Sequence, residues 1–216
     1  MISHALTIIM NELNKHLADS YGTDSTPDQP VVELGNLAEG FASTTSTGGV
    51  SRERLYMSLV NIREEKTLKN LPNRVRNDET LKVTYENPPV YINCFILITA
   101  THTNYTNALS ILSRAIRFFQ SRNTFTQDTV DPDSITMSSV PFNPLDQLDS
   151  FKLILDLYSP TMEEVNHLWG TLGGKQYPFV MYLLRMLELK FKTAPSEHEP
   201  IKEVVRNLYH KNTETH

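Results

Sequence analysis

The side chains of this 216-residue chain that could do chemistry are seven histidines, one cysteine and several acidic pairs. The histidines are scattered. No two stand four residues apart on a predicted helix and no H-E-x-x-H segment occurs, so the spacing of a helical zinc site is missing. Cys94 lies inside an apolar segment, where a thiol packs as a small hydrophobe. No G-x-S-x-G turn exposes a nucleophile. These residues predict no catalytic and no metal-binding side chain.

The acidic pairs do not form a general acid–base dyad. Glu163–Glu164 are neighbours on a predicted helix, so their side chains point in different directions. They stand in its first turn, where the helix dipole favours acidic residues. Glu64–Glu65 fall in a charged loop. His167, beside Trp169, is expected to be a packed or rim histidine rather than a catalytic one.

No cofactor is expected either. The sequence has no Walker motif and no dinucleotide fingerprint. Gly48–Gly49 could cradle a phosphate only if a helix followed directly in a βαβ unit, and the residues that follow, 52–62, read as a strand.

Composition limits the kinds of partner and the compartment that we expect for the chain. The formal net charge is −5 and no Lys/Arg run occurs, so nucleic-acid binding is not predicted. No segment supplies the ~20 apolar residues of a membrane span, and the N-terminal apolar run lacks the basic flank of a signal peptide. A lone cysteine suits a reducing compartment. We therefore expect a cytoplasmic protein, or one exported without a standard signal.

The spacing of apolar residues predicts the helices and strands that carry these side chains. Helices are predicted over 1–18, with Ser3 as a possible cap, over about 104–120, capped by Thr103 or Asn104, and at 198–211. A further helix after residue 159 is marked by Ser159-Pro160 and by a capping box from Thr161 to Glu164. The buried stripe of the 104–120 helix is expected to hold Tyr105, Ala108, Leu109, Leu112, Ala115, Ile116 and Phe119.

Strands are predicted over 31–37, 55–62, 151–157 and 177–191, with a central strand after Pro88–Pro89 that is apolar on both faces. The 55–62 strand alternates as a half-buried strand does. In 177–191, Leu187 and Leu189 are expected to share a face with Phe179, Met181 and Leu183. Residues 63–82 are expected to form an exposed hairpin arm, 40–51 a flexible loop, and 121–150 a functional loop or extra hairpin. The order predicts an α+β domain: one mixed, mostly antiparallel sheet with two main helices on one face.

Several phrases in one order resemble a known family. They are HALTIIMNELN, VVELGNLAE, LYMSLVNIREEKTLKN, NPPVYINCFILITA, YTNALSILSRAIRFFQ and LDLYSPTMEEVNHLWGTLGGKQYPFVMYLLRML. Together they resemble the N-terminal domain of the tail-terminator, or cap, proteins of extracellular contractile injection systems, which are phage-tail-like particles of the antifeeding-prophage and virulence-cassette type. The resemblance covers roughly residues 1–192.

The resemblance implies a structural role. Such caps form a hexameric ring at the end of the particle distal to the baseplate, stop growth of the inner tube, and fasten the sheath to it. The implied fold is phage tail-terminator-like over residues 1–192, followed by a linker and short amphipathic helix over 193–216. The implied partners are further copies of the chain, the tube and sheath proteins, and a second cap paralogue. No catalytic residue and no cofactor transfers from the family, and the protein would be made in the bacterial cytoplasm and built into the particle.

Contacts with these partners would fall on protruding loops, for which 38–54, 66–86 and 121–150 are candidates. The candidate protein-interface residues are Arg52, Arg54, Arg74, Arg76 and Lys82, which could face acidic tube or sheath surfaces; the competing interpretation of Arg74, Arg76 and Lys82 is a solvated loop. Two other functions stay open. A non-catalytic assembly adaptor or chaperone would be absent from finished particles, and a small enzyme would gather His, acid and hydroxyl groups in one deep pocket.

Overall fold

The computed structural model describes residues 1–22, 31–40, 50–68, 87–136 and 140–190, together with the backbone of strands at 74–77, 82–85 and 196–198. The chain divides into two compact units. The larger comprises Met1–Lys69 and Pro89–Phe191, and the smaller comprises Asn70–Pro88 and Lys192–His216. The two units are described separately below.

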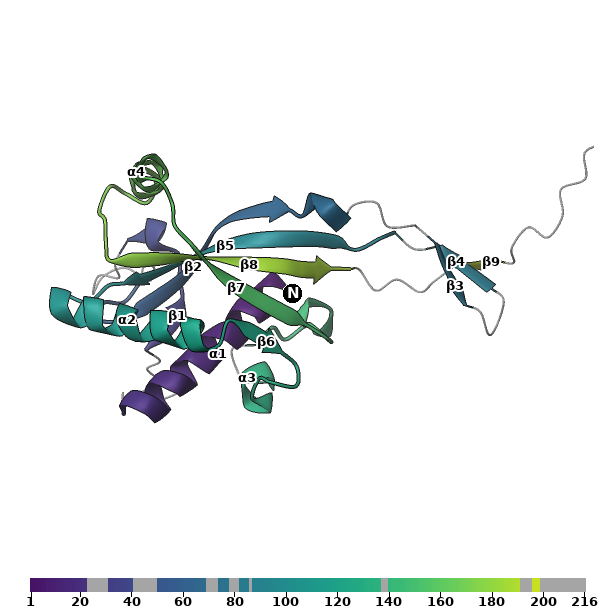
Figure 1. The fold of residues 1–216 in the computed structure, drawn as a ribbon, viewed down its shortest axis with the longest axis horizontal. Helices are drawn as coiled ribbons and strands as arrows, with labels where there is room; N and C mark the ends of the chain where they lie inside the picture. Colours follow the sequence, from purple (N-terminus) through teal and green to yellow (C-terminus); the bar gives the residue numbers. More distant parts are fainter. Residues whose placement is uncertain are drawn as a thin grey trace, which may run out of the picture. The chain divides into compact units, whose positions relative to one another are not determined.

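The larger unit is built on a six-stranded sheet in the order β1-β2-β5-β8-β7-β6 (Figure 1). β1 runs parallel to β2, and every other pair in this sheet is antiparallel. The α+β class with a mixed, mostly antiparallel sheet is therefore confirmed. The strands are β1 (Val32–Leu34), β2 (Leu55–Glu64), β5 (Val90–Ala100), β6 (Thr124–Thr126), β7 (Lys152–Tyr158) and β8 (Phe179–Leu189).

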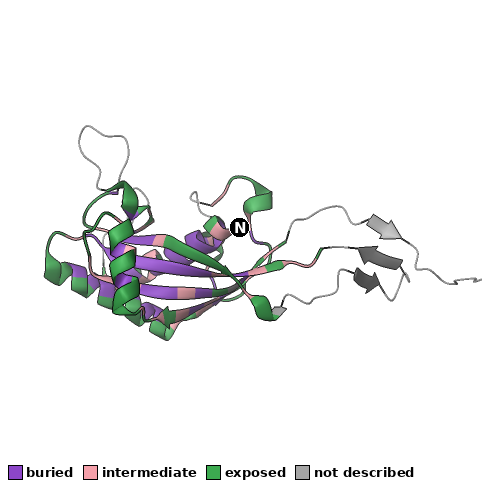
Figure 2. Cartoon of the chain, turned by 90° about the horizontal axis from the view of Figure 1, so that it is seen from above, coloured by how far each residue is buried: buried purple, intermediate pink, exposed green. Residues whose placement is uncertain are grey.

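Helices cover both faces of this sheet. The two longest, α1 (Ile2–Tyr21) and α2 (Tyr105–Ser121), lie on one face, and α4 (Met162–Thr171) lies on the other (Figure 1). The buried positions run through the middle of the strands (Figure 2). β5 occupies the centre as predicted: Cys94 and Ile96 belong to the core under α1 and α2, while Phe95 and Leu97 belong to the core under α4. This burial on two sides explains why the strand is apolar throughout.

A bulge in β8 reverses one predicted face. Cys94 pairs with Leu184, but Ile92, two residues earlier, pairs with Leu187, so β8 holds one extra residue over this span. An extra residue turns every later side chain to the other side of the sheet. Leu187 therefore joins the core under α1 and α2. The prediction that it shares a face with Met181 was wrong.

A second bulge changes the character of β2. Leu59 pairs with Ile96 and Asn61 pairs with Phe95, which leaves Val60 as the extra residue. The first three residues of β2 are buried whichever way they point, and the strand from Leu59 onwards is exposed. The expectation of a uniformly half-buried strand was therefore wrong.

The ends of the helices follow mostly local signals. Asn104 caps α2 through its side chain, as one of the two predicted residues, and Thr161 and Glu164 form the predicted capping box of α4. The alternative start at Ser159-Pro160 was wrong, because the chain is not yet helical there. Ser3 lies inside α1, whose N-cap is Met1. That helix runs to Tyr21 and ends at Gly22 in the left-handed conformation, with φ of 57°, where glycine carries no steric cost.

The buried stripe of α2 is rotated from the predicted one. Ala108, Leu112, Ala115 and Phe119 are buried as expected, but Ile111 and Phe118 are buried as well. Phe118 turns toward α1, where its ring centroid lies 5.0 Å from that of His16. The expected members Tyr105, Leu109 and Ile116 are exposed instead, because α1 packs on the opposite side of the helix.

The free edge of β1 is covered by one side chain of α1. The amide of Asn14 donates from Nδ2 to the carbonyl oxygen of Val32 and accepts at Oδ1 from the Val32 N–H, each at 2.9 Å. It thus forms the two bonds that a neighbouring strand would form at that residue. Covering an edge in this way suppresses unwanted strand pairing.

The region 121–150 does not form a hairpin of its own. It contributes β6 to the end of the large sheet, followed by α3 (Pro132–Thr136) and the short 3-10 helix η3 (Pro144–Asp146). Side chains of α1 hold it: Asn11 Nδ2 donates to the Ser134 carbonyl at 3.1 Å, and His4 Nδ1 accepts from the Leu148 N–H at 2.8 Å. The alternative of an extra hairpin was therefore wrong for the described part of this region, and a functional role for it stays a prediction. Two further 3-10 helices are η1 (Leu37–Glu39) and η2 (Lys66–Leu68).

The smaller unit contains a three-stranded antiparallel sheet in the order β3-β4-β9. β3 (Arg74–Asn77) and β4 (Lys82–Tyr85) form a hairpin, which places two paired strands in the region expected to be a hairpin arm. β9 (Ser196–His198) pairs with β4. The predicted helix at 198–211 lies outside the described residues apart from His198 itself, which is in β9, and the flexible loop at 40–51 lies outside them at 41–49. Among the described helices, none has the length and apolarity to cross a membrane.

Candidate functional site

Of the basic residues expected at an interface, Arg54 is engaged within the larger unit. Its guanidinium pairs with the Glu33 carboxylate of β1, and the other oxygen of that carboxylate accepts from the Tyr56 hydroxyl at 3.1 Å. This arrangement ties β1 to β2 just where the parallel pair begins. Arg52 is exposed two residues away. The interface role of both arginines remains a prediction.

Between these arginines, Glu53 holds the chain to the start of α2. Its φ is 63°, a left-handed conformation that is uncommon for a residue with a side chain. Its Oε1 accepts from the Thr103 N–H at 2.8 Å, and this hydrogen bond lowers the pKa of the carboxyl group. The Thr101 hydroxyl also donates to the Arg54 carbonyl at 3.0 Å. Residues 51–54 are thus held to residues 101–104 by hydrogen bonds.

The other three candidates are in the smaller unit. Arg74 and Arg76 are on β3, opposite Tyr85 and Val83, and Lys82 begins β4 opposite Asn77. Their side chains lie outside what the structure describes. The hairpin brings these three residues onto one pair of strands, and their interface role also remains a prediction.

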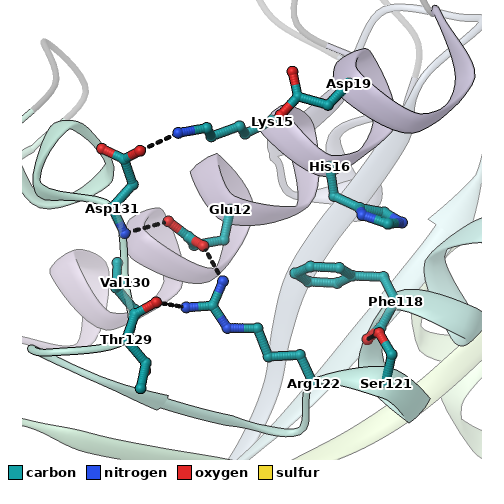
Figure 3. A pocket seen from close by; sticks show the side chains of 10 residues that line it. All are labelled: Glu12, Lys15, His16, Asp19, Phe118, Ser121, Arg122, Thr129, Val130 and Asp131. Carbon is teal, nitrogen blue, oxygen red and sulfur yellow. Dashed lines mark hydrogen bonds and ion pairs between the residues drawn. The ribbon is translucent and has the colours of Figure 1, made fainter.

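A hollow lined by several charged side chains lies between α1, the end of α2 and the turn after β6 (Figure 3). It has a volume of about 420 Å³. Glu12, only 5% exposed, is its centre: Oε1 accepts from the Asp131 N–H at 2.9 Å, and Oε2 pairs with Arg122. The second guanidinium nitrogen of Arg122 donates to the Thr129 carbonyl.

A second ion pair closes the same hollow. Lys15 pairs with Asp131, and their hydrogen bond raises the pKa of the lysine and lowers that of the aspartate. Four charged groups in Figure 3, those of Glu12, Lys15, Arg122 and Asp131, therefore point at partners within the molecule. Such a network holds elements together, since a poised acid or base needs a group that is left to react. We assign the hollow a structural role.

The histidines and the cysteine do not converge on a site among the described residues. His4 is buried, with Nε2 3.2 Å from the Ile135 carbonyl, and burial lowers its pKa. Burial raises the pKa of the Cys94 thiol to about 11, which keeps it protonated and inert. His167, expected in the core or at its rim, is exposed on α4, and Trp169 is buried. Within the described residues, no group of three or more His, Cys, Asp or Glu is placed to hold a metal ion.

Apolar side chains on the outside are the features that sequence reasoning missed. Phe142 is fully exposed, and Leu145 beside it is half-exposed, on the segment around η3. Tyr105, Leu109 and Ile116 form an exposed stripe along α2. The spacing of that stripe was visible in the sequence, but it was assigned to the core. The surface around η3 could have been suspected from Phe142 itself, because it is a large apolar residue in a polar stretch between two prolines.

Comparisons with known proteins give the class of the fold. The chain resembles a solved structure that is described as the sheath/tube terminator of an extracellular contractile injection system (PVC), in the extended state. The TM-score is 0.52 and the sequence identity 13%, and the alignment covers 96% of this chain and 65% of that one. Another is described as the tube-terminating cap of the anti-feeding prophage: TM-score 0.50, 15% identity, covering 92% of this chain and 59% of that one. The fold is therefore that of a terminator or cap protein.

The family follows from the sequence. The family described as the Pvc16 N-terminal domain matches residues 4–203, and the chain belongs to that family. The resemblance seen in the ordered phrases is thereby confirmed. No curated protein sequence matches the chain significantly. The chain spans less than two thirds of the length of the two solved structures that it resembles.

Proposed function

We propose that this chain is a structural cap, or tail terminator, of a contractile injection particle. The observation that carries the proposal is the family match over residues 4–203. The likeness of fold to a sheath/tube terminator and a tube-terminating cap supports it. In this proposal the chain acts by binding other proteins of the particle, and no chemical step is assigned to it.

The construction of the larger unit suits such a role. A terminator must keep its shape while the structures attached to it are under load. The sheet is covered on both faces by two packed cores, and the ion pairs of Glu12 and Lys15 join segments more than a hundred residues apart. Close packing makes a protein interior stiff.

In this proposal, copies of the chain form a hexameric ring at the end of the particle distal to the baseplate. The ring contacts the inner tube protein, the sheath protein and a second cap paralogue. Arg52, Arg54, Arg74, Arg76 and Lys82 are the proposed interface residues. Arg54 already pairs with Glu33, so the cost of breaking that pair argues for a smaller share of the binding energy at this residue. The protein is made in the bacterial cytoplasm and leaves the cell as part of the particle.

Deletion of the gene in the producing bacterium tests the proposal. Particles imaged by electron microscopy should then have tubes or sheaths of uncontrolled length, or should not be stable at all. The strain should also lack any second cap gene, and this chain alone should restore the length when supplied on a plasmid. Particles of normal length and stability after the deletion would refute a terminator role. Restored length with a chain that is absent from purified particles would instead indicate an assembly adaptor.

A further inference from the structure

The segments around the hollow between α1 and the end of α2 carry an excess of negative charge. With histidine counted as neutral, α1 and residues 122–133 together contain two basic residues, Lys15 and Arg122, and five acidic ones: Glu12, Asp19, Asp128, Asp131 and Asp133. Both cations are already paired, Arg122 with Glu12 and Lys15 with Asp131. Three carboxylates are therefore left over, and the surface around the hollow is acidic.

The three remaining carboxylates are open to solvent. Asp19, Asp128 and Asp133 are all exposed, and within the described part of the chain none of their carboxylates forms a hydrogen bond or an ion pair. Asp19 lines the hollow, one turn after Lys15 on α1 (Figure 3). Asp128 and Asp133 flank the lining residues 129–131 in the chain. A cation that arrives from outside can therefore reach all three.

Asp19 occupies an unfavourable place for an acidic residue. It lies in the last turn of α1, which ends at Tyr21 and has no basic residue in that turn. The C-terminal end of a helix carries a partial negative charge, so a cation is favourable there and a carboxylate is not. Arg114 of α2 lies over the Tyr21 ring, 4.4 Å from its centroid, and does not line the hollow. A positive group beside Asp19 would be attracted both by the carboxylate and by the helix end.

The hollow has the size and the walls for one arginine side chain. Its volume of about 420 Å³ lies in the range of roughly 300–1,000 Å³ that is usual for small-ligand sites. The rings of His16 and Phe118, whose centroids are 5.0 Å apart, stand on one side of it (Figure 3). The carbon chain of an arginine can lie along such rings while its charge stays at a polar group. A planar guanidinium also forms two parallel hydrogen bonds to one carboxylate, which an ammonium group cannot do.

We propose that this acidic surface binds a basic segment of another protein, with one arginine of that segment in the hollow beside Asp19. Further basic residues of the segment lie against Asp128 and Asp133. The ion pairs of Glu12 and Lys15 keep the hollow in shape, and Asp19, which belongs to neither pair, supplies the contact. The inference does not depend on the cap role, because it follows from the charge and shape of the described residues.

A peptide titration of the full chain, followed by NMR of the 15N-labelled protein at low salt, tests the inference. The probe is the peptide GRGRGRG, blocked at both ends. Amide signals around Asp19 and in residues 127–133 should shift, and added salt should weaken the binding because it screens exposed charges. The same peptide with citrulline in place of arginine keeps the shape but loses the charge, and should cause no shifts.

A matched pair of triple variants separates this surface from the overall charge of the protein. The variant with Asp19→Asn, Asp128→Asn and Asp133→Asn should bind the arginine peptide roughly tenfold more weakly or worse. The control removes three exposed carboxylates elsewhere in the larger unit, through Glu39→Gln, Glu163→Gln and Glu188→Gln. It has the same net charge and should bind within about twofold of the wild type. Thermal denaturation checks that both variants fold.

Asp19→Asn alone tests the arginine in the hollow. The wild type should bind GRGRGRG more tightly than GKGKGKG, whereas this variant should bind the two peptides alike. An unchanged preference for arginine in Asp19→Asn would overturn the assignment of the hollow. Absence of shifts in the wild type, shifts confined to other parts of the chain, or equal binding by the two triple variants would overturn the whole inference.

Discussion

Arg122, the residue that ends α2, forms an ion pair with Glu12, which is buried in the middle of α1. The same glutamate accepts from the backbone N–H of Asp131, and Arg122 also donates to the Thr129 carbonyl. One acidic side chain therefore joins the first helix, the end of the second helix and the turn after β6. This contact explains why a charged residue stands in the apolar face of α1.

Replacement of Glu12 by glutamine should destabilise the fold. The substitution leaves Arg122 without its partner, and breaking a buried pair costs about 3–5 kcal/mol. Because the Arg122 side chain is 30% exposed, water offsets part of this, and we expect a loss of about 2 kcal/mol in the free energy of unfolding. Urea denaturation gives the value, with Glu163→Gln on the exposed side of α4 as the control. Equal stability of the two variants would mean that the pair is not structural.

Core substitutions on α2 and β5 should separate buried from exposed leucines and isoleucines. Ile96 is completely buried and Leu112 is 7% exposed, whereas Leu109, one turn away, is 42% exposed. Ile96→Ala and Leu112→Ala should each lower the free energy of unfolding by about 2–5 kcal/mol, because each leaves a cavity. Leu109→Ala should cost less than about 1 kcal/mol. A loss below about 1 kcal/mol at both buried positions would contradict the core assignment.

Local signals in the sequence were enough to place most elements. Asn104 and the Thr161–Glu164 pair announce the starts of α2 and α4 because capping depends only on residues within one turn. The two-sided apolar pattern of β5 likewise required no knowledge of its neighbours. These features made the fold class and the central strand predictable.

Other features depend on residues far away in the chain. The bulge in β8 lies in its pairing with β5, and no turn residue marks it, so the face of Leu187 could not be read from alternation. The rotation of α2 is set by α1, a hundred residues earlier. Glu12 and Arg122 carry no local signature of their contact. The candidate surface at Phe142 was missed because a lone phenylalanine in a polar stretch does not reveal whether it is covered.

The Asn14 amide should protect the edge of the large sheet. Asn14→Ala removes both hydrogen bonds to Val32, and a buried backbone group left without a partner costs about 1–3 kcal/mol. Hydrogen exchange at the Val32 amide should accelerate strongly, while Asn107→Ala on the exposed face of α2 should change nothing at that position. An unaltered exchange rate in Asn14→Ala would show that the strand edge is covered by something else.

Two histidines should make the fold weaker in mild acid. Burial lowers the pKa of His4 and of His102 below the ordinary value of 6.5. Between the lowered folded value and 6.5, the unfolded chain binds more protons than the folded one, so stability falls as pH decreases through this window. The positive N-terminal ammonium acts on His4 in the same direction, and Glu53 opposes the effect at His102.

Substitution separates the two contributions. His4→Asn, whose Oδ1 can accept from the Leu148 N–H in place of Nδ1, should reduce the loss of stability on going from neutral to mildly acidic pH. His102→Asn should remove the remainder, and the double variant should be nearly flat in this window. Thermal denaturation at a series of pH values provides the measurement. A double variant with the slope of the wild type would assign the acid sensitivity to other groups.

The position of the chain in a finished particle tests the cap role most directly. An epitope-tagged copy replaces the natural gene in the producing bacterium, and purified particles are labelled with gold-conjugated antibody and imaged by electron microscopy, with untagged particles as the control. The cap proposal predicts label at a single end of each particle, opposite the baseplate. Label that is absent, spread along the sheath or confined to the baseplate would contradict it.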